Sequence, residues 1–117
     1  MKRALIVVSL LLSLSAVACA RNVLLNWDQA DPGPVTSNAY RRSGPCSGTG
    51  SFTKINTADI PANTFTDSNV PFGRWSYQVT AVATVEGAPV ESAPSNCAEV
   101  VVTPSSPQNL TLTLDPP

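Results

Sequence analysis

The feature that most constrains this fold is the separation of short alternating apolar runs by proline and glycine. Eleven prolines and six glycines are spread at short intervals over 117 residues, and both residue types interrupt long helices. No segment after residue 20 has the apolar stripe of an amphipathic helix. The chain is therefore expected to form short strands rather than helices.

Period-two alternation locates these strands. The clearest run is Trp75 to Val85, in which Trp75, Tyr77, Val79 and Ala81 alternate with mainly polar residues. The expected strands are 23–27, 38–42, 51–55, 64–66, 75–85, 97–103 and 110–114, separated by the turn-rich segments 28–34, 43–50, 67–69 and 86–89. About seven short strands in a single domain predict an all-β fold, an antiparallel two-sheet sandwich. The residues expected in its core are Val23, Leu25, Trp27, Phe65, Trp75, Tyr77, Val79 and Ala81.

The N-terminus has the three parts of a secretory signal peptide. Lys2 and Arg3 precede the apolar run 4–14, and small residues then lead to Ala18-Cys19-Ala20. This pattern predicts a signal peptide over residues 1–20, cleaved before Arg21, and a secreted, periplasmic or cell-surface protein. The run is too short for a comfortable membrane span. A second interpretation is lipidation of Cys19, which would anchor the protein to a membrane by lipid.

Charge and composition exclude several function classes. Residues 21–117 carry eight acidic and five basic side chains, a net charge of about −3, and a nucleic-acid-binding protein would carry a basic patch. The chain has no histidine, so the Ser-His-Asp, Cys-His and His-metal arrangements are absent. We expect no enzymatic activity, no cofactor and no metal.

A few polar residues have more than one interpretation. Arg41 and Arg42 could bind an acidic partner, although a solvated strand end is the favoured interpretation. Loop carboxylates and amides could bind calcium, although turn formation is the commoner role; the candidates are Asp28, Asp31, Asp67 and Asn69.

The order of the runs resembles a known family. The segments that carry the resemblance are Val23-x-Leu25-x-Trp27, Asn38-Ala39-Tyr40-Arg41, 52–56, 64–67, and Tyr77 to Val82 followed by Glu91 to Asn96. Over residues 22–103 the chain is similar to bacterial fibronectin type III domains. This resemblance implies an immunoglobulin-like sandwich over residues 21–104, in a non-catalytic extracellular binding or spacer module.

Two places differ from the family pattern. Trp75 stands where the family usually has a tyrosine whose hydroxyl ties a corner to the backbone; alternatively Tyr77 takes that role. The family's first strand is missing before Val23, yet Pro107 to Thr111 resembles it. Residues 105–117 are therefore expected to be a strand or a linker. The favoured hypothesis is that 107–114 pairs beside 23–27 of the same molecule; the rivals are a linker and the covering of a second molecule's edge.

Cys46 and Cys97 form an even pair in a chain that is expected to be exported, which favours a disulfide. If the last hairpin turns near Gly87, Cys97 lies opposite about Tyr77. The strand that ends near Arg42 reaches the same end of the sheet, so Cys46 would emerge nearby. We therefore predict a Cys46–Cys97 disulfide.

Two function classes remain open. The first is a binding or spacer module that interacts with an extracellular protein or a surface. The second is an accessory module of polysaccharide degradation that binds carbohydrate on exposed aromatic residues. Trp27 and Trp75 are expected in the core, which leaves Tyr40 and Phe72 as candidates for such a platform.

Overall fold

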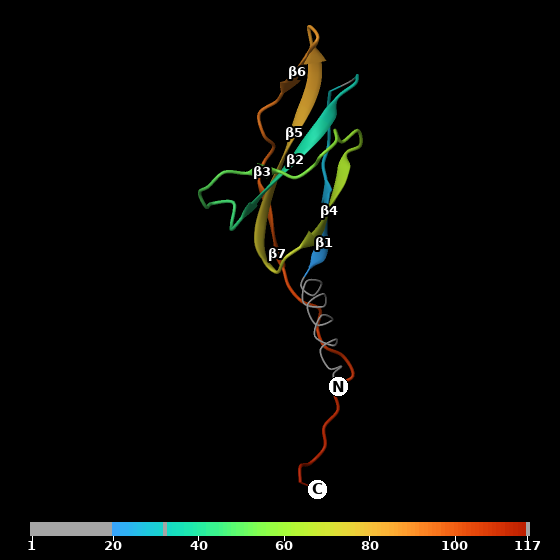
Figure 1. The fold of residues 1–117 in the computed structure, drawn as a ribbon, viewed down its shortest axis with the longest axis vertical. Coiled ribbons are helices and arrows are strands. Elements are labelled where there is room, and N and C mark those ends of the chain that lie inside the picture. Colours follow the sequence, from blue (N-terminus) through green and yellow to red (C-terminus); the bar gives the residue numbers. More distant parts are fainter. Residues whose placement is uncertain (1–19, 32, 117) are drawn as a thin grey trace, which may run out of the picture.

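A computed structural model describes residues 20–31 and 33–116. Within this part the protein is all-β and has no helix (Figure 1). Its strands are β1 (Arg21–Asn26), β2 (Thr36–Ser43), β3 (Thr53–Lys54), β4 (Thr64–Val70), β5 (Gly73–Val85), β6 (Ala88–Glu91) and β7 (Ala98–Val102). The predicted fold class, an antiparallel two-sheet β-sandwich, is confirmed. The signal-peptide and Cys19 lipidation predictions concern residues that lie outside, or at the edge of, the described part.

The two sheets are unequal in size. The small sheet contains only β1 and β4, and the larger one has the order β3-β2-β5-β6, with β7 also paired to β5. The 13-residue strand β5 is the centre of the larger sheet, because it pairs with β2 on one side and with β6 and β7 on the other. The small sheet therefore depends on packing against the larger one, since two strands alone are marginally stable.

The core lies between the sheets. Leu25, Ala39, Ile60 and Tyr77 are its buried members. The partly buried residues packed against them are Val23, Trp27, Ile55, Phe65, Trp75, Val79 and Val100. Seven of the eight expected core residues belong to this cluster, while Ala81 is half-buried farther along β5. The alternation in β1 and β5 thus places their apolar faces inward.

Between β6 and β7, which both pair with β5, two serines bond to β5 in place of regular strand pairing. Ser92 N–H donates to the Ala81 carbonyl, and the Ser92 hydroxyl accepts from Ala81 N–H. Ser95 forms the same pair of bonds with Val79. Side chains thereby replace strand pairing across a segment that contains Pro94, which has no N–H to donate. The irregular segment shifts the register by two residues: continued β6 pairing would place Asn96 opposite Tyr77, but Ala98 lies there, one residue beyond the predicted Cys97.

Three strand predictions need correction. Residues 67–69 belong to β4 rather than to a turn, because β4 continues to Val70 in pairing with β1. In the segment 51–55 only Thr53 and Lys54 form a strand, paired with Arg41 and Tyr40 of β2. The hairpin turn at Glu86 and Gly87 is shorter than expected and is followed at once by β6, a strand that we did not predict.

The predicted self-docked strand at 107–114 is wrong. Residues 103–114 have no secondary structure, and Leu110, Leu112 and Leu114 are 84–86% exposed. Figure 1 shows this segment leaving the end of the sandwich beyond β7. The reason is the direction in which the chain leaves β7. This strand ends beside the start of β1, where Arg21 donates to the Thr103 carbonyl at 3.0 Å. The segment would have to reverse immediately after Pro104 to lie along β1.

Candidate binding edge

The free edge of β1 is the main open feature of the sandwich. Among the described strands β1 pairs only with β4, so its other edge carries unpaired backbone groups. A groove of about 340 Å³ lies along this edge, with β1 on one side and parts of β5 and β7 on the other. We call this feature the β1 groove; its lining residues include Val23, Leu25, Trp27, Val79, Ser95 and Val100.

The β1 groove has a mainly apolar lining, which forms its floor, and a few polar residues. Val23, Leu25 and Trp27 contribute their core-facing side chains, and the polar residues Ser95 and Asn96 are also among the lining residues. The buried indole N–H of Trp27 has no hydrogen-bond partner among the described residues. Unpaired backbone groups beside an apolar floor are the features that an added strand requires.

A largely buried ion pair fixes the strands behind this groove. Arg41 on β2 and Asp67 on β4 are joined by a 2.8 Å salt bridge, and the Tyr77 hydroxyl of β5 donates to the same carboxylate oxygen at 2.8 Å. The guanidinium of Arg41 also lies 4.6 Å from the centre of the Trp75 ring. Arg41 is therefore engaged within the domain rather than a solvated strand end, and Asp67 is engaged by Arg41 and Tyr77.

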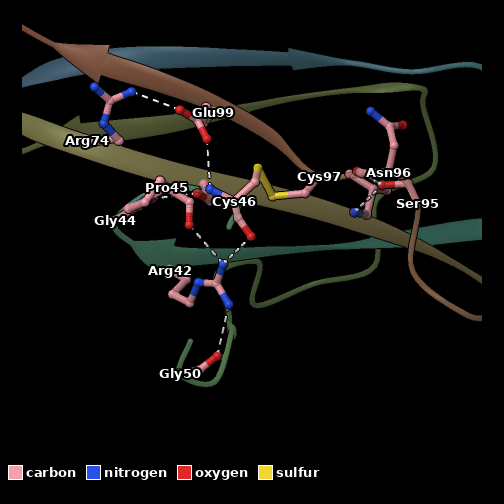
Figure 2. The surroundings of a disulfide bond; sticks show 12 residues. Arg42, Gly44, Pro45, Cys46, Gly50, Arg74, Ser95, Asn96, Cys97 and Glu99 are labelled. Carbon is pink, nitrogen blue, oxygen red and sulfur yellow. Dashed lines mark hydrogen bonds and ion pairs between the residues drawn. A yellow bond between two sulfur atoms is a disulfide. The ribbon is translucent and has the colours of Figure 1, made fainter. Parts of the chain in front are cut away.

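The disulfide fixes the larger sheet at the same level as this cluster, because Cys97 precedes Ala98, the β7 residue that pairs with Tyr77. Cys46 and Cys97 are bonded, as predicted, and join the loop after β2 to the start of β7 (Figure 2). Arg42 donates to the carbonyls of Pro45, Cys46 and Gly50 at 3.0–3.1 Å. Arg42 thus organises the loop and, like Arg41, has a structural role. A disulfide is typical of a protein that folds in an oxidising compartment.

Glu99 completes the attachment of this loop. Its carboxylate accepts from Cys46 N–H at 2.7 Å and from Arg74 at 2.8 Å, as Figure 2 shows. The bond from Cys46 N–H, followed by the nearby Arg74, lowers the pKa of Glu99 below its ordinary value. The loop is therefore held to β7 by a charge-assisted hydrogen bond as well as by the disulfide.

No family model and no curated protein matches this sequence. In the described part of the chain, no helix is long and apolar enough to cross a membrane. That part also contains no group of three or more acidic or cysteine side chains placed to hold a metal ion. The structure itself is compatible with an immunoglobulin-like or fibronectin type III-like fold.

Trp75, which stands where the resembled family usually has a tyrosine, forms its own hydrogen bond to the backbone. Its indole N–H donates to the Pro71 carbonyl at 2.9 Å and so joins the start of β5 to the preceding turn. Tyr77, the alternative candidate, bonds to Asp67 instead. The indole N–H thus donates to a backbone carbonyl, as a tyrosine hydroxyl could.

The two aromatic residues proposed for a sugar platform lie apart. Tyr40 pairs across β2 and β5 with Gln78, whereas Phe72 precedes the first residue of β5. Six residues of extended chain separate these levels, about 20 Å. The Tyr40 hydroxyl donates to Glu91, which also accepts from Thr80 and Asn38. Tyr40 is thus part of a polar cluster and forms no row with Phe72.

Sequence reasoning missed several buried polar residues. Asn56 accepts from Ala39 N–H at 2.8 Å and donates to Asn38 and to the Ala58 carbonyl, which fastens the segment after β3 to β2. Ser76 is fully buried and donates to the Gly44 carbonyl. Most of their partners are distant in sequence, so alternation alone does not reveal that these polar side chains are buried. The only signal was the low fraction of charged residues, 13%, which leaves uncharged groups to satisfy buried backbone.

Tyr77 provides an alkaline test of the buried cluster. Burial and the bond to Asp67 raise its pKa above the ordinary value near 10. The stability that the protonated Tyr77 hydroxyl contributes is therefore fully present below pH 10. It is lost as the pH rises above that value, by up to about 1.4 kcal/mol per pH unit. In urea titrations at pH 7 to 11.5, Tyr77→Phe is expected to be less stable than the wild type at neutral pH. The difference between their free energies of unfolding should narrow above pH 10.

The matched control for this titration is Tyr40→Phe. The pKa of Tyr40 is also raised, first by its bond to Glu91, but its hydroxyl lies at the surface. Tyr40→Phe should therefore abolish a smaller part of the loss of stability above pH 10 than Tyr77→Phe does. Parallel stability curves for the wild type and Tyr77→Phe across the whole range would contradict the assignment.

Proposed function

We propose that this chain is an exported, non-catalytic binding module of the fibronectin type III kind that holds extended segments of extracellular proteins at the β1 groove. The observation that carries the proposal is the unpaired edge of β1 beside an apolar floor. An extended segment adds to such an edge through its main chain, and alternate side chains enter the groove.

The composition of β1 supports this role. Natural edge strands are commonly protected from pairing by lysine, proline or a charge that points inward. Residues 22–27 contain none of these, and Leu24 is 62% exposed beside the edge. A bulge between Arg21 and Val23 interrupts the pairing only at the start of the strand. The remaining edge is free to accept a partner strand.

The fold around the groove supports a rigid binding site. The Arg41–Asp67–Tyr77 cluster connects three strands behind the groove, and the disulfide fixes the start of β7, one of its walls. A groove that is already formed loses less conformational entropy on binding. The disulfide and the N-terminal signal pattern together support export to an oxidising environment.

Hydrogen exchange on the disulfide-bonded protein tests this function. Eight-residue peptides with leucine or valine at alternate positions are expected to slow exchange of the β1 amides. Peptides of the same composition with the apolar residues grouped together serve as the matched control, because they cannot present one apolar face as a strand. If no alternating peptide protects β1 at millimolar concentration, the proposed function is refuted.

A further inference from the structure

The segment that follows β7 has the properties of a strand without a partner. Leu110, Leu112 and Leu114 alternate with Thr111 and Thr113 and are almost fully exposed. Alternation of leucine with a β-branched residue favours a strand with one apolar face. Residues 104–114 also contain no charged side chain, so nothing in them opposes burial. We call residues 110–114 the leucine segment.

We propose that the leucine segment of one molecule occupies the β1 groove of a second molecule, as the third strand of its small sheet. This inference rests on the proposed function and names its partner: a second copy of this chain. The small sheet has two strands and an open edge, and the same chain carries an exposed five-residue strand candidate. Three strands with an apolar face are far more stable than two.

The apolar residues of the two strands match in number and spacing. Side chains directly opposite each other in an antiparallel pair lie on the same face of the sheet. With Leu112 opposite Leu25, Leu110 lies opposite Trp27 and Leu114 opposite Val23. All three leucines then enter the groove beside the three residues of β1 that pack against the core. Thr111 and Thr113 point away from the core, on the face of exposed Leu24 and Asn26.

The direction in which the chain leaves β7 explains why the leucine segment in the groove comes from another molecule. An antiparallel partner of β1 must enter at the Trp27 end, whereas a molecule's own segment leaves β7 at the Arg21 end. The six residues 104–109 reach at most about 20 Å, which is the length of β1 itself. They would be fully extended along the sandwich, with no residue left for the reversing turn. A second molecule can present its leucine segment from the Trp27 end without this constraint.

Sedimentation of the purified disulfide-bonded protein over a range of concentrations is the first test. The contact joins two different surfaces, the leucine segment and the β1 groove. The wild type is therefore expected to form dimers if two molecules insert their segments into each other, and longer chains if each molecule inserts its segment into the next. Leu112→Lys should weaken this association about 30-fold or more, since a buried leucine is replaced by a charge. Thr111→Lys is the matched control: it adds the same charge on the outward face and should leave association unchanged.

A peptide of residues 105–117, added to the Leu112→Lys protein, is the second test. It is expected to slow exchange of the β1 amides and to change the fluorescence of Trp27, and the same peptide with Leu112→Lys should do neither. Binding of other alternating peptides but not of this one would overturn the inference and leave the proposed function standing. A wild type that stays monomeric at all concentrations, association unaffected by Leu112→Lys, or protection confined to β7 would each overturn it as well.

Discussion

Replacing both Cys46 and Cys97 with serine is expected to lower the free energy of unfolding by about 4 kcal/mol. The disulfide joins residues 51 positions apart, and closing so long a loop removes much of the conformational freedom of the unfolded chain. Domains of this size are stable by only about 5–15 kcal/mol. The double variant should therefore be marginally folded at room temperature.

Urea unfolding of the two proteins measures this effect. With a typical dependence of about 2 kcal/mol per molar urea, the midpoint should fall by roughly 2 M. Adding a reductant to the wild type should give a similar loss, while the double variant should not respond to the reductant. A difference of less than about 1 kcal/mol would mean that the unfolded chain is already compact around this loop.

Asp67→Ala is expected to cost about 3 kcal/mol of stability. The substitution leaves the Arg41 guanidinium without its counter-ion and the Tyr77 hydroxyl without its acceptor. Breaking a buried pair by removing one partner costs about 3–5 kcal/mol. The lower end is expected because the Arg41 side chain keeps 27% exposure, whereas that of Asp67 keeps 10%.

The chain offers a matched control for this substitution. Arg74 and Glu99 form a second salt bridge with the same 2.8 Å distance, but their side chains are 48% and 35% exposed. Arg74→Ala should cost at most about 1 kcal/mol, because water screens an exposed pair. Adding Arg41→Met to Asp67→Ala should recover part of the loss, since it removes the uncompensated charge. Equal losses for Asp67→Ala and Arg74→Ala would disprove the role assigned to burial.

The sequence predicted what depends on local pattern. Alternation over Trp75 to Val85 located β5 and its inward face, and the pairing of Cys46 with Cys97 followed from the expected neighbours of that strand. Both inferences need only the period of a strand and the order of elements. Even the register was predicted to within one residue, since Ala98 rather than Cys97 faces Tyr77.

What could not be predicted depends on partners distant in sequence. Asp67 had the sequence environment of a turn, and only the approach of Arg41 and Tyr77 makes it a buried member of β4. The course of residues 107–114 was misjudged for a related reason. Their composition indicates a strand, but whether a strand finds its edge depends on the end of the sandwich from which it starts.

The position of the disulfide also determines how the domain would respond to tension. Arg21 and Thr103 lie together at one end of the sandwich, so a pull on the two ends peels β1 and β7 away rather than shearing them. The load then passes from Cys46 to Cys97 through the covalent bond and bypasses residues 47–96. Arg21 and Thr103 could separate by roughly 110 Å instead of roughly 290 Å. Such a domain would yield a short, fixed length under force and keep β3, β4, β5 and β6 within the covalent loop.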